Sequence, residues 1–326
     1  MTTIKDVARR AQVAISTVSY ALNNKKKLKK ETIDKIIKAA QELNYQPNLT
    51  ARSLKTKKTN AIGVIVPDLS NMFFTEIIKG IEDVISKNDY TIILCCTYED
   101  SNKENNYLKT LINKDIDGLI FVGTGKNQSI SMEKTGLPIV IVDRKIGKNF
   151  VSVMVDNKKG GYLATKHLLD KNRNEIYLFT GPLSVNTYFD RMSGYIQALK
   201  EYSLDHNESL IVECNVDYEG GYNSVEKLIH DKKPINAIFA TNDLIAIGAI
   251  KKLIKCNYKI PLDVSIVGYD DIPTASMINP ELTTIRQPKF IMGKKSAELV
   301  IDMINGKKIE NAHIIMEPEL IERESS

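Results

Sequence analysis

Near the start of the chain, apolar residues recur at the spacing of short amphipathic helices. They predict a first helix from Thr3, a break at residues 12–14, a second helix from Ile15 and a third over residues 30–43. Because so few residues join the first two helices, these helices cross steeply. This is the arrangement of the helix-turn-helix motif, whose second helix enters the major groove of DNA. The pattern therefore predicts an all-α head that binds double-stranded DNA.

After residue 60 the pattern changes to short apolar runs that alternate with amphipathic helices. The candidate strands are Ile62–Pro67, Thr91–Thr97, Gly118–Gly123, Ile139–Asp143, Ser152–Asp156, Glu175–Gly181, Leu210–Asn215, Ala237–Thr241 and Val264–Tyr269. Because these runs are nearly all apolar, they fit the strands of parallel sheets that are buried on both faces. Two successive series of strands and helices, separated by a helix around residues 158–169, predict an α/β body of two doubly wound lobes.

Charge is divided unevenly between these two parts. Residues 1–58 hold 14 lysine and arginine residues against 4 acidic ones, a net charge of +10, whereas residues 59–326 carry a net charge of −5. Contacts with DNA phosphates require such localised positive charge. The charge therefore favours a DNA-binding head over a small helical bundle that binds no DNA. The lysine run 25–30 is either a solvated loop or a further phosphate contact.

Enzyme motifs are absent from the sequence. It contains no GxGxxG fingerprint, no Walker A loop and no GxSxG elbow, and its four histidines and four cysteines have no metal or triad spacing. We therefore expect no enzymatic activity, no cofactor and no metal site. No apolar run approaches about 20 residues, so no membrane span is expected. The lack of a signal peptide predicts a cytoplasmic protein with reduced thiols.

Two segments, DVARRAQVAISTVSYALN and ELNYQPNLTARSLKTKKTNAIGVIVPD, resemble the amino terminus of the lactose/galactose repressor family of bacterial regulators. The resemblance extends over the whole chain, and its body resembles a periplasmic sugar-binding protein. It implies a helix-turn-helix domain at residues 1–46, a hinge at 47–59 and an effector-binding and dimerisation domain at 60–326. It also implies three crossings between the lobes, which give lobe one residues of about 60–157 and 289–313, and lobe two residues of about 158–288 and 314–326.

The resemblance also implies a set of DNA-contact residues in the head and hinge. They are Thr3, Ile15, Ser16, Thr17, Ser19, Tyr20, Asn48, Arg52, Leu54 and Lys55. By position, Ile15, Ser16 and Tyr20 face the base edges. Most family members have an arginine where Tyr20 stands, and a tyrosine cannot make the bidentate contact of arginine with guanine. The operator rules of the family therefore do not transfer to this position.

The remaining DNA contacts are expected to position the protein rather than read the sequence. Thr17 and Ser19 would contact phosphates. In the family a hinge leucine, here Leu54, wedges into the minor groove, where a pair of such side chains would kink the duplex. The alternative is that Leu54 only packs the linker against the body, and the flanking Arg52 and Lys55 argue against it.

Polar and aromatic side chains gather where the predicted strands end, the edge at which open α/β sheets bind ligands. The candidate effector-binding residues are Asp68, Asn71, Phe73, Phe74, Asp143, Arg144, Arg191, Asn242, Asp243 and Asp270. Arg191 stands where family members place an arginine that forks two vicinal hydroxyls or a carboxylate. The two phenylalanines stack on a sugar or purine ring or belong to the core. Asp243 binds the effector or caps the following helix.

These residues favour a sugar or sugar derivative as the effector. Two alternatives stay open: a purine co-repressor, or a protein co-regulator as in the catabolite-control members of the family. Two reading heads on a pseudo-palindromic operator require a homodimer. Lobe closure around the effector would change the separation of the two hinges. We expect repression that the bound sugar relieves.

Overall fold

The computed structural model describes residues 2–23, 28–45, 58–123, 132–133, 135–147, 149–310 and 312–326. Its contacts divide the chain into two compact units, Met1–Thr59 and Asn60–Ser326, which we call the head and the body. The predicted DNA contacts Asn48, Arg52, Leu54 and Lys55 lie outside the described residues.

Helices form the described part of the head. They are α1 (Ile4–Ala11), α2 (Ile15–Asn23) and α3 (Lys30–Glu42). The first begins at Thr3, whose backbone N–H and side-chain hydroxyl both donate to the Asp6 carboxylate, at 2.9 and 2.7 Å. It ends at Gln12, whose left-handed backbone (φ 55°) reverses the chain before α2. The apolar faces of the three helices meet in one small core.

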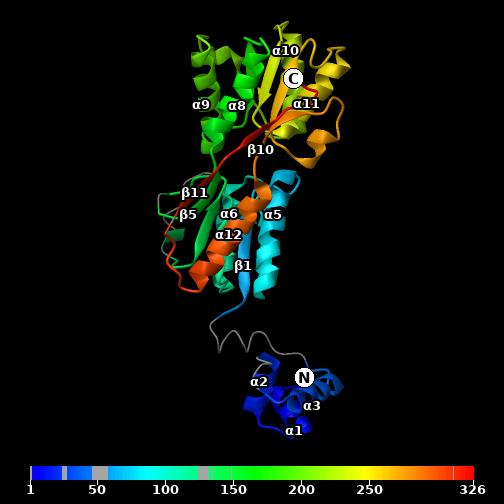
Figure 1. Cartoon of the computed structure of the whole chain (residues 1–326), viewed down its shortest axis with the longest axis vertical. Coiled ribbons are helices and arrows are strands. Elements are labelled where there is room, and N and C mark those ends of the chain that lie inside the picture. The colour runs from blue at the N-terminus through cyan, green and yellow to red at the C-terminus, as the bar shows by residue number, and fades with distance from the viewer. Residues whose placement is uncertain are drawn as a thin grey trace. The chain divides into compact units, whose positions relative to one another are not determined.

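The first lobe of the body is built on a parallel sheet (Figure 1). Within the described residues it has six strands, in the order β11-β5-β4-β3-β1-β2. The strands are β1 (Ala61–Val66), β2 (Thr91–Cys96), β3 (Gly118–Phe121), β4 (Ile139–Val142), β5 (Val151–Val155) and β11 (His313–Met316). Two adjacent helices, α5 (Met72–Ile85) and α12 (Lys289–Ile304), cover one face, and α6 (Ser101–Asn113) packs on the other. A short 3-10 turn, η2 (Ser86–Asn88), follows α5.

The second lobe repeats this plan, with described strands in the order β12-β10-β9-β8-β6-β7. They are β6 (Ile176–Thr180), β7 (Ile211–Glu213), β8 (Ala237–Ala240), β9 (Ser265–Asp270), β10 (Thr283–Arg286) and β12 (Glu319–Ile321). Only β12 runs antiparallel to its neighbour among these pairs. The pair α8 (Asn157–Asp170) and α9 (Asn186–Glu201) covers one face, and α10 (Tyr218–His230) and α11 (Asp243–Lys255) cover the other. The 3-10 turns are η3 (Glu208–Leu210) and η4 (Pro273–Ser276).

The chain passes between the lobes after β5, after β10 and between β11 and β12. The sequence assigned residues 314–326 to lobe two, and for residues 314–316 this was wrong. Ile314 pairs with Val153 and Met316 with Val155, so these residues extend the sheet of lobe one. Apolar character alone does not distinguish the two sheets, because β11 and β12 follow each other almost without a break (Figure 1).

Candidate DNA-binding face and effector site

The start of α2 presents the side chains that the sequence expects to meet DNA. Ile15 is 45% exposed although it is a large apolar residue, and Ser16 beside it is exposed. Thr17, Ser19 and Tyr20 are half-buried. Thr3, the predicted contact on the first helix, is exposed and bonded to Asp6 as the helix cap.

Backbone groups close the first turn of α2. The carbonyl of Ala14 accepts from the N–H groups of Thr17 and Val18, at 2.9 and 3.1 Å. Ala14 itself contributes no side-chain acceptor at this end of the helix.

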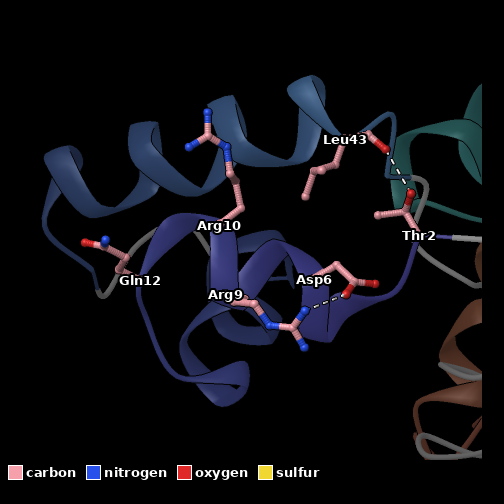
Figure 2. A pocket seen from close by; sticks show the side chains of 6 residues that line it. All are labelled: Thr2, Asp6, Arg9, Arg10, Gln12 and Leu43. Carbon is pink, nitrogen blue, oxygen red and sulfur yellow. Dashed lines mark hydrogen bonds and ion pairs between the residues drawn. The ribbon is translucent and has the colours of Figure 1, made fainter.

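A hollow of about 680 Å³ opens on the head (Figure 2). It is lined by Thr2, Asp6, Arg9, Arg10, Gln12 and Leu43. Its arginines are in ion pairs, Arg9 with Asp6 at 3.7 Å and Arg10 with Glu42 at 2.7 Å. None of the lining residues belongs to α2, so the hollow is separate from the helix expected to enter the DNA groove.

In the body, buried polar side chains from both lobes form a linked set at the carboxyl ends of the strands. We call this set the interlobe cluster; it consists of Asp143, Arg144, Asn157, Arg191, Thr241, Asn242, Asp270 and Gln287. Asp143 of lobe one lies close enough to Arg191 and Asp270 of lobe two to interact with both electrostatically, by attraction to Arg191 and repulsion from Asp270. This is the edge at which the sequence placed the effector.

Arg191 lies at the centre of the interlobe cluster. It is 4% exposed, and its guanidinium donates to Asn157 Oδ1 at 2.8 Å and to the carbonyl of Thr241. Its Cζ atom lies 3.7 Å from the centre of the Tyr269 ring, and Nη2 is 3.9 Å from Asp270 Oδ1. Hydrogen bonds and a cation–π contact thus fix the plane of the guanidinium.

Asp270 is held in an unusual backbone conformation, with φ at 114°. Its carboxylate accepts from Gln287 Nε2 at 2.6 Å, and its carbonyl accepts from Lys289 Nζ. Burial raises the pKa of Asp270 to about 6, although Arg191 and Lys289 oppose the shift. The site thus holds a carboxyl group that is poorly hydrated and easily protonated. A non-glycine residue in such a conformation often marks a functional site.

Several buried atoms of the interlobe cluster have no hydrogen-bond partner among the described residues. They are Asp143 Oδ1, Arg144 Nε, Thr241 Oγ1, Asn242 Nδ2 and Gln287 Oε1. Buried polar groups are nearly always paired in folded proteins, so a cluster of free ones is expected where a ligand binds. The set mixes donors with acceptors and comes from both lobes.

Other sequence candidates have their polar atoms engaged. Asn71 caps α5 by accepting from Phe73 N–H, and Asp68 accepts from the N–H and hydroxyl of Ser70. Both oxygens of Asp243 are used, by Ile272 N–H at 2.8 Å and the Thr284 hydroxyl at 2.5 Å. The cap of α11 is Asn242, which accepts from Ile245 N–H through Oδ1 and keeps Nδ2 free. Burial raises the pKa of Asp243.

The two phenylalanines and Arg144 also make internal contacts. Phe73 and Phe74 are buried in the core of lobe one and meet edge to face, with ring centres 5.0 Å apart. Arg144 forks the carboxylate of Glu99 at 2.7 and 2.8 Å and also donates to the carbonyl of Gly123. The Nε atom of Arg144 lies 3.9 Å from Asp143.

Sequence reasoning missed four residues of this region: Glu99, Asn157, Gln287 and Lys289. Asn157 and Lys289 are the first residues of the helices that follow two lobe crossings, and Gln287 lies on one of them. A signal was available, because a segment that crosses from one lobe to the other lies between the ends of the two sheets. Glu99 follows a strand end, as the predicted residues do, but its pairing with Arg144 depends on the fold of the loop.

A helix-turn-helix head joined to a two-lobed α/β body with a buried polar cluster defines a ligand-responsive DNA-binding regulator. Residues 59–324 match the family model described as periplasmic binding proteins and sugar binding domain of the LacI family. Residues 3–48 match the model of bacterial regulatory proteins of the lacI family. The chain therefore belongs to the LacI family; it is a DNA-binding transcriptional repressor and not an enzyme.

Relatives match over almost the whole chain. The repressor PurR of Aliivibrio salmonicida is 37% identical over 329 residues, covering 100% of this chain and 99% of its own, and the ribose operon repressor of Haemophilus influenzae is 36% identical over 327 residues, covering 100% and 98%. A solved LacI-family regulator of Enterococcus faecium with bound ribose is 31% identical and covers 82% of this chain and 98% of its own, with a TM-score of 0.74. Within the described residues, no helix is long and apolar enough to cross a membrane.

Proposed function

We propose that the effector of this repressor is a sugar or sugar derivative bound between the lobes by the interlobe cluster. Asp143, Arg191, Asn242, Asp270 and Gln287 are its contacts. The observation that carries this proposal is the set of buried, unpaired donors and acceptors that both lobes contribute. Each sugar hydroxyl donates and accepts at once, so adjacent hydroxyls satisfy a mixed set of this kind. A relative named as a ribose operon repressor and a solved regulator with bound ribose support the same class.

Similarity to PurR favours a purine effector, but the contacts of the two phenylalanines argue against it. A flat base needs an open aromatic face to stack on. Phe73 and Phe74 are 3% and 5% exposed, and their rings cross at 79°. A protein co-regulator would leave the buried polar atoms of the interlobe cluster unpaired. We therefore place the sugar first.

The repressor acts in the cytoplasm as a homodimer on a pseudo-palindromic operator. Two heads related by a two-fold axis read two half-sites, so dimerisation sets their spacing. The sugar contacts both lobes and therefore favours one lobe arrangement over another. We propose that the favoured arrangement releases the operator. An operator affinity that rises when the sugar is added would reverse this sign.

The first test is a thermal-unfolding screen of the full-length protein against sugars, sugar phosphates and purines. A ligand present at 100 times its dissociation constant adds about 2.7 kcal/mol to the free energy of unfolding, enough to raise the melting temperature by several degrees. We expect stabilisation by a neutral sugar and loss of that stabilisation in Arg191→Ala.

Arg173→Ala is the matched control for this test. Arg173 also donates hydrogen bonds within lobe two, to Ser265, Pro261 and Leu262, and it is not part of the interlobe cluster. The control variant should bind the sugar as the wild type does. Stabilisation by a purine, and by no sugar, would identify a purine as the effector. Equal loss of sugar binding in both arginine variants would show that Arg191 supports binding only by stabilising lobe two and does not contact the sugar.

A further inference from the structure

One guanidinium of the interlobe cluster is already occupied by an anion of the protein itself. Glu99 presents both carboxylate oxygens to Arg144, at 2.7 and 2.8 Å. This is the bidentate geometry in which arginine binds carboxylates and phosphates of ligands. Glu99 therefore stands where an anionic group of an effector would stand.

The turn that carries Glu99 is held in an unfavourable backbone conformation. Tyr98 and Glu99, between β2 and α6, both have left-handed backbones, with φ of 53° and 57°. Neither is a glycine, and two successive left-handed residues disfavour the turn. Such outliers persist where the surrounding contacts determine them, and here the fork with Arg144 is the contact that the second residue makes.

Access to the two partners is unequal. The side chain of Arg144 is 3% exposed, whereas that of Glu99 is 51% exposed. The Glu99 carboxylate therefore occupies the place at which a small anion would be forked by Nη1 and Nη2 of Arg144. Removal of that carboxylate would open the guanidinium to solvent anions without disturbing the core around it.

The charges of the interlobe cluster leave no cation for an anionic effector. Arg191 faces Asp270 at 3.9 Å and also interacts with Asp143. Arg144 faces Glu99 and Asp143. Lys289, the third buried cation of this region, donates to the carbonyls of Asp270 and Asp271 and interacts with Asp243. Each of these three cations thus already faces a carboxylate of the protein, and an anionic ligand would have to compete with it.

We infer that Glu99 is a specificity-determining residue, which fills the anion-binding fork of Arg144 and restricts the effector site to uncharged ligands. This inference rests on the proposed function and narrows it to neutral sugars. The Glu99 carboxylate acts as a fixed internal anion. It excludes phosphorylated and carboxylated molecules because it repels their negative charge and because it already occupies the donors of Arg144. Specificity of this kind arises from a repulsive element and not only from attractive contacts.

The test uses inorganic phosphate as the probe, and the full-length protein. Thermal unfolding is followed in sodium phosphate and in sodium chloride at equal ionic strength and pH, for the wild type and for Glu99→Gln. We expect no phosphate-specific stabilisation of the wild type. The variant should gain a rise in melting temperature of at least about 2 °C, and the gain should vanish in Glu99→Gln combined with Arg144→Met.

Two further variants control the interpretation. Glu226→Gln removes the exposed carboxylate of another ion pair, with Lys252 at 2.7 Å, and should gain no phosphate effect. Glu99→Ala vacates the fork without an amide and should behave as Glu99→Gln does. The inference is overturned if neither Glu99 variant responds to phosphate, or if the wild type responds as strongly as they do.

A paired ligand set separates this inference from the proposed function. Binding of ribose and ribose 5-phosphate is measured for the wild type and Glu99→Gln. We expect the wild type to bind the phosphorylated sugar at least about 10-fold more weakly than the neutral one, and the variant to lose that preference. If neither sugar binds but phosphate stabilises only the Glu99 variants, the sugar proposal fails, and the inference that Glu99 blocks anion binding at Arg144 holds. If the wild type prefers the phosphorylated sugar, the inference fails and the sugar proposal stands.

Discussion

Asp270 gives the sharpest test of the interlobe cluster, because burial of its carboxylate opposes folding and the same group is a proposed ligand contact. Burial raises its pKa from 3.8 to about 6. One pKa unit corresponds to about 1.4 kcal/mol, so the ionised group lowers the free energy of unfolding by about 3 kcal/mol above pH 6. Asp270→Asn removes the charge and keeps an oxygen that accepts from Gln287 Nε2.

The pH dependence of this difference has a defined sign. Between pH 6 and pH 4 the folded state binds the proton of Asp270 more tightly than the unfolded chain does, so the wild type gains stability as pH falls. The amide of the variant does not titrate. We therefore expect Asp270→Asn to unfold with the higher free energy at pH 7.5, and the difference to shrink as the pH falls from about 6 to 4.

Urea unfolding followed by circular dichroism measures this, since the chain has no tryptophan to report by fluorescence. Asp302→Asn, which removes an exposed carboxylate, controls for net charge. Sugar binding should weaken by roughly 10- to 100-fold in Asp270→Asn, because a hydrogen bond to a charged acceptor contributes about 1.5–3 kcal/mol. A stability difference that is constant from pH 7.5 to pH 5, or a variant less stable than the wild type at pH 7.5, would refute the reasoning.

Three further changes test other parts of the molecule. Thr3→Ala removes the hydroxyl that donates to Asp6 at the start of α1 and keeps the backbone N–H bond to the same carboxylate. It should destabilise the head by about 1 kcal/mol in thermal unfolding, and an unchanged head would show that the backbone bond alone suffices. Gly161→Ala places a Cβ 2.0 Å from the carbonyl oxygen of Arg191. It should lower the free energy of unfolding by about 1–3 kcal/mol and weaken sugar binding measured by calorimetry. Normal sugar binding would mean that α8 and α9 can move apart without disturbing the site. Leu54→Ala should weaken operator binding by about 10-fold or more in mobility-shift assays, and equal losses on nonspecific DNA would count against the wedge.

Much of the fold could be predicted because the elements differ in their apolar period. Strands buried on both faces gave continuous apolar runs, and strands β1 to β9 start and end within a few residues of the predicted ones. The strands β10, β11 and β12 were not among the predicted ones. The error at residues 314–316 has a physical cause. Sheet membership depends on which strand lies alongside, and a run such as Ile314–Ile315–Met316 would fit the edge of either sheet.

The candidate site could be predicted only in part, because strand ends are local features whereas contacts are not. The sequence placed Asp143, Arg191 and Asp270 at one edge, and the structure brings them together. It did not show that both carboxylate oxygens of Asp243 accept hydrogen bonds, from Ile272 and Thr284. These partners are distant in the sequence, and Thr284 is 41 residues away. Which polar atoms remain free for a ligand depends on the finished network and not on residue type.

The segment that joins β10 to α12 contributes to the interlobe cluster and also begins a helix of the first lobe. Gln287 bonds the Asp270 carboxylate, and Lys289, the first residue of α12, bonds the carbonyls of Asp270 and Asp271. That helix packs so closely on α5 that a Cβ at Gly293 would lie 2.0 Å from a backbone oxygen of α5.

The two helices therefore move together, and α5 follows β1, the first strand after the head. An effector that bonds Asp270 or Gln287 acts directly on the start of α12 and hence on this packed pair. It changes operator affinity only to the extent that it binds one lobe arrangement better than the other. A ligand held by one lobe alone would bind without regulating. Regulation therefore requires contacts from both lobes. For this reason the free polar atoms of Asp143 and Asn242, which lie on opposite lobes, are more important for regulation than any single strong contact.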